Sequence, residues 1–143
     1  MTSMDNNTPP SAASDLTWLL DGFKDRVPGV ETVLIASVDG RATHVMTGLH
    51  VDDADRLAAI TSGAYGLMRR ADVEFGGPGL VRQQVAQLDK RTFFVTAAAE
   101  NSLLAVVTGP EADAGQVGHE MALLATRAAT YLATQSRTPD AAV

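Results

Sequence analysis

An Asp-Gly pair at Asp39-Gly40 separates two strand-like segments and constrains the fold more than any other feature of this sequence. An apolar run over residues 30–38 precedes the pair, and a second extended segment over residues 41–47 follows it. This arrangement is a strong β-hairpin signal, because both central positions of a type I′ turn need positive φ. Residues 33–36 are apolar on both faces, as in a central strand. We therefore expect helices on both sides of the sheet that contains this hairpin.

Two segments that flank the hairpin have helical apolar spacing. Ser14 is expected to cap the first helix, which ends before Pro28-Gly29. Asp52 or Asp53 is expected to cap a second, longer helix that ends near Glu74. The second helix carries an apolar stripe with spacings of three and four, typical of an amphipathic helix. The stripe consists of Leu57, Ile60, Ala64, Leu67, Met68 and Ala71.

Three further strands are expected at residues 80–88, 91–97 and 103–108. Asp113 and Gln116 then have capping-box spacing and open a last amphipathic helix. The element order is therefore α-β-β-α-β-β-β-α. This order predicts an α/β chain of the α+β type, with a five-stranded antiparallel sheet and helices on both faces. We expect the last of these strands to lie beside the first strand of the hairpin, in the middle, and residues 80–88 to lie toward an edge.

Length, charge and cysteine content exclude several classes of protein. The 143 residues predict one domain over residues 14–136, with disordered tails at 1–13 and 137–143. A formal net charge of −6 opposes binding to nucleic acid. The absence of cysteine excludes disulfides and suits a cytoplasmic location. No apolar run approaches the ~20 residues that cross a bilayer, and no secretory signal is present, so we expect no direct membrane insertion.

No group of residues indicates catalysis, a metal or a cofactor. His44, His50 and His119 lack the spacing of metal ligands, and Gly76-Gly-Pro-Gly79 lacks the Lys-Ser/Thr of a phosphate-binding P-loop. Asp52, Asp53 and Asp55 are most simply explained as residues of a helix start. Thr61-Ser-Gly63 lacks the first glycine of a nucleophile elbow. We expect no catalytic, metal or cofactor-binding residues and no enzyme activity.

Two segments predict contact with a second copy of the chain. Gly63 and Gly66 lie inside the second helix, where each costs about 1 kcal/mol relative to Ala unless a close contact compensates. The segment 80–88 contains no proline that would block strand addition. The predicted dimer interface consists of Ala59, Ser62, Gly63, Tyr65, Gly66, Arg70, Arg82, Gln84 and Ala86.

Simpler explanations of the same residues stay open. The glycines could tolerate a bend or lie on an exposed surface. Arginine and glutamine side chains, or a loop, could protect the edge strand. Arg69 and Arg70 near the end of a helix are also favoured by the helix dipole.

Four segments together resemble the roadblock family, named for dynein light chains, in its actinobacterial branch. The likeness runs over residues 16–131 and departs at residues 83–88, where relatives are more apolar and acidic. The matching segments are Ile35-Ala-Ser-Val-Asp-Gly-Arg41, Ala58-Ala-Ile-Thr-Ser-Gly63, Phe75-Gly-Gly-Pro-Gly-Leu-Val-Arg82 and Ala114-Gly-Gln-Val-Gly-His-Glu-Met-Ala-Leu-Leu124.

The resemblance implies a homodimer in which two edge strands join into one sheet and the two middle helices pack together. It further implies a regulatory partner, a Ras-like small GTPase, and association with a histidine-kinase-like membrane protein complex that recruits the module to the membrane. Arg69, Arg70 and Arg82 are the arginines to test for partner binding, although none is a convincing arginine finger. Two other functions stay open: a small-ligand sensor of the PAS or GAF type, and a structural scaffold without a GTPase partner.

Overall fold

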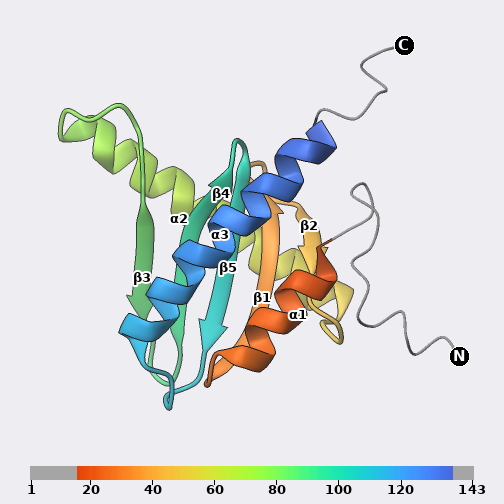
Figure 1. Cartoon of the computed structure of the whole chain (residues 1–143). Helices are drawn as coiled ribbons and strands as arrows, with labels where there is room; N and C mark the ends of the chain where they lie inside the picture. The colour runs from red at the N-terminus through yellow and green to blue at the C-terminus, as the bar shows by residue number, and fades with distance from the viewer. Residues whose placement is uncertain (1–15, 137–143) are drawn as a thin grey trace, which may run out of the picture.

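The structure is a computed structural model that describes residues 16–136 of the chain. Its helices and strands follow the predicted order (Figure 1). The predicted tails at 1–13 and 137–143, and the predicted cap Ser14, lie outside the described residues. In chain order the elements are α1 (Thr17–Arg26), β1 (Val30–Ser37), β2 (Ala42–Val45), α2 (Val51–Glu74), β3 (Gln83–Gln87), β4 (Thr92–Ala99), β5 (Ser102–Thr108) and α3 (Ala114–Ser136).

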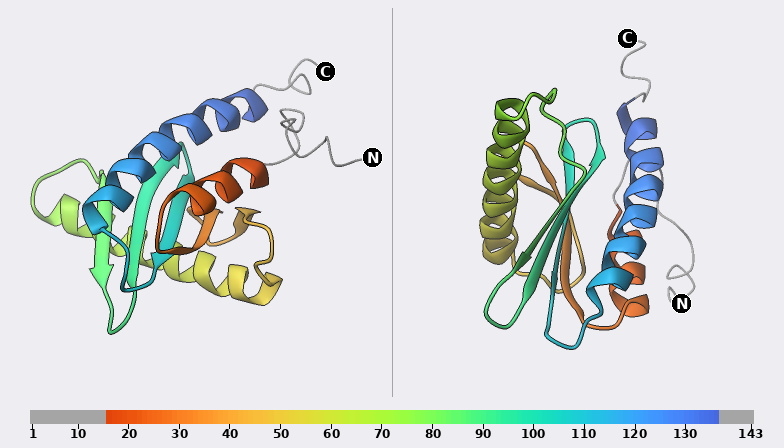
Figure 2. Two further views of the ribbon diagram at one scale, coloured as in Figure 1. Left: turned by 60° about the horizontal axis from the view of Figure 1, so that its bottom comes forward. Right: turned by 90° about the vertical axis from the view of Figure 1, so that its left-hand side faces the viewer.

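The five strands form one antiparallel sheet in the spatial order β2-β1-β5-β4-β3. The pairing of β1 with β5 in the middle is confirmed, and it runs from Val30 opposite Thr108 to Ser37 opposite Ser102. The edge position of β3 is also confirmed, and β2 forms the other edge. Helices α1 and α3 lie on one face of the sheet and α2 lies on the other (Figure 2).

The hairpin around Asp39-Gly40 is confirmed, but its turn is not of type I′. Gly40 has a φ of 98°, and Asn101 is the only non-glycine residue with positive φ in the part of the chain that the structure describes. The Gly40 N–H donates to the Ser37 carbonyl (3.0 Å), and the Ser37 N–H donates to the Arg41 carbonyl (2.8 Å). Such a loop needs positive φ only at the glycine. Asp39 has no positive φ, and its carboxylate accepts a hydrogen bond from the Ser37 hydroxyl.

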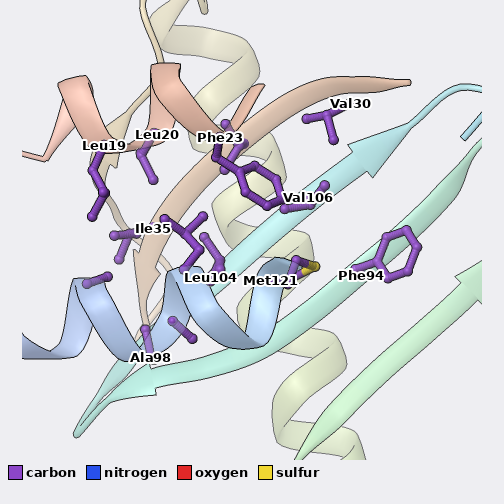
Figure 3. Close-up of a cluster of buried hydrophobic side chains, with 14 of the residues drawn as sticks. Leu19, Leu20, Phe23, Val30, Ile35, Phe94, Ala98, Leu104, Val106 and Met121 are labelled. Atoms are coloured by element: carbon purple, nitrogen blue, oxygen red, sulfur yellow. The ribbon is translucent and has the colours of Figure 1, made fainter. Parts of the chain in front are cut away.

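The larger core lies between the sheet and the pair α1 and α3 (Figure 3). Phe23 of α1, Leu104 of β5 and Met121 of α3 are fully buried there. Trp18 and Tyr131 meet edge to face, with ring centroids 5.5 Å apart, and so join α1 to α3. Large aliphatic and aromatic side chains fill this layer, so it contributes most of the hydrophobic stabilisation.

The core between the sheet and α2 is built mainly from small side chains. Thr61 is also buried on α2, and its hydroxyl donates to the Leu57 carbonyl one turn earlier (2.7 Å). The short alanine side chains give α2 only a narrow contact with the strands. The buried residues of this cluster are Leu34, Ala36, Ala54, Ala58 and Ala105.

The apolar stripe of α2 lies on a different side of the helix from these buried alanines. Ile60, Leu67 and Met68 are 59%, 70% and 42% exposed. An apolar stripe on a helix ordinarily faces the core, but here the small residues take that role. The apolar spacing therefore predicts the helix correctly. It does not predict which face packs on the sheet, and most of the large apolar side chains of the stripe are exposed.

One predicted helix start is wrong, that of α2. At α1, Leu16 occupies the N-cap and makes no side-chain cap. His50 caps α2, because its Nδ1 accepts from the Asp52 N–H (3.0 Å) and thereby places both aspartates inside the first turn. The start of α3 is as predicted, since the Asp113 carboxylate accepts from the Gln116 N–H (3.1 Å). Across residues 16–136, no helix is both long enough and apolar enough to span a membrane.

Candidate functional site

The exposed stripe of α2 lies beside β3 and forms one surface with it. The Gln84 side-chain amide donates to the Ala64 carbonyl (3.3 Å), which fixes this flank of α2 next to the edge strand. Because side chains alternate along a strand, Ala86 and Leu88 lie on the same side of the sheet as Gln84. We call this surface the α2–β3 face. It comprises Ile60, Ala64, Leu67, Met68 and Ala71 of α2, Phe75 and Leu80 of the following loop, and Arg82, Gln84, Ala86 and Leu88 at β3.

The loop between α2 and β3 is fixed by the end of the helix. The Asp72 carboxylate accepts hydrogen bonds from the N–H groups of Gly79 (2.8 Å) and Leu80 (2.9 Å). A Cβ at Gly77 would collide with the same carboxylate, so a larger residue there would displace Asp72 from the loop. These bonds explain why β3 begins at Gln83 and not at residue 80 as predicted: the Leu80 N–H is already engaged. The loop N–H groups of Gly79 and Leu80 therefore bind a side chain of this chain.

The fixed loop presents an aromatic side chain to solvent. Phe75 is 90% exposed, at the end of α2. Next to it, a hollow of about 400 Å³ is lined by Met68, Ala71, Asp72 and Phe75 together with residues 80–84, so its lining is both apolar and polar. Exposed aromatic side chains beside such a hollow are enriched in protein interfaces.

The edge of β3 presents a row of unpaired backbone groups. The Leu88 N–H donates to the Arg91 carbonyl (2.7 Å), in the same register that pairs β3 with β4. Because hydrogen-bonded and non-bonded pairs alternate in an antiparallel ladder, Gln83, Val85 and Gln87 direct their N–H and C=O groups away from β4. Within residues 16–136, no strand pairs with this edge. It is therefore a template for strand addition.

The predicted small-residue surface of α2 lies largely outside this face. The Ser62 hydroxyl donates to the Val38 carbonyl (2.5 Å), and that flank of α2 faces the loop between β1 and β2. Ala59, three residues before Ser62, and Gly66, four residues after it, lie on the same flank of the helix. Gly63 borders Ile60 and Leu67. Ser62 thus contacts its own chain, whereas a Cβ at Gly63 or Gly66 would meet no atom within 4 Å. The place of these residues in a dimer interface stays a prediction.

The three candidate arginines differ in their partners. Arg69 donates from Nε to the Gly79 carbonyl (3.2 Å), and its guanidinium lies 5.9 Å from the centre of the Tyr65 ring, so it supports the loop. Arg70 pairs with Glu74 (3.0 Å). Arg82 lines the hollow and makes no ion pair with any residue that the structure describes. Arg82 is thus the one of the three whose guanidinium makes no hydrogen bond or ion pair with the residues that the structure describes.

The described residues contain no group of three or more side chains placed to hold a metal ion. His50 instead caps α2, and the Asp53 carboxylate pairs with Arg56 (2.5 Å). Sequence reasoning missed Asp72 and Phe75. The signal available for both was their position just before a Gly-Gly-Pro-Gly segment, where a helix must end and its last residues must hold the loop.

Comparison with known proteins identifies the family to which the chain is similar. The family model described as the Roadblock/LC7 domain matches residues 16–108. A crystal structure of a Roadblock/LC7 domain from Streptomyces avermitilis is 44% identical, covers 83% of this chain and 98% of its own, and has a TM-score of 0.77. A second Roadblock/LC7 domain from that organism is 33% identical, covers 80% of this chain and 98% of its own, and has a TM-score of 0.65.

A more distant similarity extends to the gliding protein MglB of Thermus thermophilus. It is 16% identical, covers 86% of this chain and 92% of its own, and has a TM-score of 0.74. At this identity the likeness concerns the fold alone. No curated protein matches the chain.

Proposed function

This chain belongs to the Roadblock/LC7 family, and from this premise we propose that it is a non-catalytic homodimeric module that binds and modulates a Ras-like small GTPase in a signalling complex. The observation that carries the dimer is the α2–β3 face, where an open strand edge adjoins exposed apolar side chains. The GTPase as partner rests on the family resemblance. The protein is expected to act in the cytoplasm and to reach a membrane through its partners, which include a histidine-kinase-like membrane protein complex.

A second copy of the chain fits the β3 edge in one register best. If Val85 lies on the two-fold axis, Gln83 of each copy faces Gln87 of the other, and all five residues of β3 find a partner. The outward N–H and C=O groups of Val85 then bond to those of Val85 in the other copy, and those of Gln83 bond to those of Gln87 in the other copy. Moving the axis to a neighbouring residue leaves part of the strand unpaired.

The same register brings the α2–β3 faces of the two copies together on the α2 side of the sheet. With Val85 on the axis, Leu88 of one copy lies opposite Arg82 of the other, next to the hollow that Met68 and Phe75 line. Leu88 is 58% exposed in a single copy. The two α2 helices approach each other along Ile60 and Leu67, so the stripe that the core does not use is buried between copies.

A cysteine at position 85 tests this register. The chain has no cysteine, so oxidation of Val85→Cys forms a disulfide only between two copies. Opposed residues of a hydrogen-bonded pair have Cα atoms about 5.5 Å apart, within the range that a disulfide spans. We expect a covalent dimer on non-reducing electrophoresis. Val51→Cys, an exposed position at the start of α2, is the control, and cross-linking of Val85→Cys no faster than this control would contradict the register.

Binding to a Ras-like GTPase is tested by co-elution with the partner loaded with GTP or with GDP. We expect a complex that contains two copies of this chain, and weaker binding with Arg82→Ala. Arg127→Ala, an exposed arginine of α3, is the matched control and should bind as the wild type does. Since this chain offers no convincing arginine finger, any change in the hydrolysis rate should come from ordering of the GTPase's own catalytic groups. Absence of binding in both nucleotide states would reject the GTPase and favour a scaffold or a ligand sensor.

A further inference from the structure

The second edge of the sheet, β2, is built differently from β3. The Met46 N–H donates to the Val33 carbonyl (3.3 Å), in register with the pairing of Leu34 and Val45. By the alternation of an antiparallel ladder, Val45 therefore directs its N–H and C=O groups away from β1, and Thr47 follows in the turn directly after the strand. Without further contacts, these groups would make β2 a second template for strand addition.

Two side chains of α1 occupy this edge. The Thr17 hydroxyl donates to the Val45 carbonyl (2.9 Å). Four residues later on the same face of the helix, the Asp21 carboxylate accepts from the Thr47 N–H (2.8 Å) and from the Thr47 hydroxyl (2.6 Å). A carbonyl and an N–H that an incoming strand would need are thus already bonded within the chain.

We infer that Thr17 and Asp21 close the β2 edge to strand addition, so that the sheet grows only at β3 and assembly stops at two copies. The part of this inference that concerns growth at β3 rests on the proposed dimer. A chain with one open edge can form only a closed two-fold pair by strand addition, whereas a chain with two open edges can continue into an open fibre. The α1 side chains therefore determine the stoichiometry of the assembly without contacting the second copy.

The contrast with β3 supports this assignment. Gln84 sends its side chain to the Ala64 carbonyl, and Gln83 donates to the Thr96 hydroxyl (3.2 Å). Both contacts point toward neighbouring elements of the same chain. Within residues 16–136, no side chain forms a hydrogen bond with the outward N–H and C=O groups of Val85. One edge is closed by helix side chains and the other is left open.

The double variant Thr17→Val/Asp21→Ala tests the inference. We expect light scattering to give a mass above that of a dimer, rising with protein concentration, while the wild type stays at the mass of a dimer. Asp21→Asn keeps an acceptor for the Thr47 N–H and should stay dimeric. Thr126→Val, which removes a hydroxyl bonded to the Ala122 carbonyl on α3, is the matched control for Thr17. A folded double variant that remains strictly dimeric would overturn the inference.

Failure of the dimer and failure of edge closure give different results. A monomeric wild type rejects the proposed dimer, and in that case a double variant that associates still supports closure of β2. If the double variant does not fold, hydrogen exchange in Asp21→Ala alone decides. Closure predicts that the Thr47 amide exchanges about tenfold faster or more than in the wild type, with the amides of β5 unchanged. An unchanged rate at Thr47 would contradict the role of Asp21.

Discussion

Replacing Leu67 by aspartate is expected to convert the proposed dimer into monomers that remain folded. Leu67 is 70% exposed in a single copy and belongs to the stripe that the core does not use, so the substitution costs the monomer little. In the dimer, burial of each Leu67 side chain contributes about 1.5–3 kcal/mol to the free energy of association. Because both copies carry the substitution, this contribution is lost twice. The dissociation constant should rise roughly 100-fold or more. Sedimentation velocity over a concentration series measures it.

The matched control for this substitution is Leu123→Asp. Leu123 is a leucine of α3 that is 49% exposed, on the opposite side of the sheet from α2. The Leu123→Asp substitution should leave the dimer intact, because it adds the same charge to a surface that lies outside the proposed interface. Equal dissociation constants for Leu67→Asp and the wild type would show that α2 is not part of the interface.

Replacing Phe23 by alanine is expected to lower the free energy of unfolding by about 3–5 kcal/mol. Phe23 is fully buried between α1, the sheet and α3, in the cluster of large side chains. The cavity left by a phenyl ring cannot be filled by rigid neighbours, so the loss includes both the transfer and the cavity cost. This is a large part of the about 5–15 kcal/mol that stabilises a typical domain. Urea denaturation monitored by circular dichroism measures the change.

Dimerisation also adds to apparent stability, so this comparison is best made in the monomeric Leu67→Asp background. There, Phe75→Ala is the control: the same chemical change at a residue that is 90% exposed. It should alter the free energy of unfolding by less than about 0.5 kcal/mol. Similar losses for the two phenylalanines would contradict the described core.

The parts of the fold that the sequence predicts are those fixed by local signals. The hairpin follows from Asp39-Gly40, whose glycine supplies the positive φ that the loop needs. The start of α3 follows from Asp113, whose carboxylate bonds to Gln116 as the spacing indicates. The central place of β5 follows from its continuous apolar run, which only a strand covered on both faces can bury.

The errors arise where tertiary contacts compete with local preference. His50 caps α2 ahead of two aspartates because its ring reaches the Asp52 N–H. Residues 80–82 stay outside β3 because Asp72 holds the Leu80 N–H. Neither contact has a spacing rule that identifies it from sequence.

The candidate site is harder to predict, because periodicity does not say what covers an apolar face. The stripe containing Ile60 and Leu67 is regular enough to be a core face, yet Ala54 and Ala58 occupy that position. Gly63 and Gly66 predict a contact on α2, because glycine lowers the stability of a helix unless something compensates. Gly63 does border the exposed stripe. Only the three-dimensional arrangement shows that the stripe and the β3 edge form one surface.

The central claim is that the α2–β3 face joins two copies, and hydrogen exchange at β3 tests it most directly. The amides of Gln83, Val85 and Gln87 point away from β4, so in a single copy they are open to solvent. At high micromolar concentration, the account predicts that they exchange slowly in the wild type and at unprotected rates in Leu67→Asp. Unprotected exchange of all three amides in the wild type would contradict it.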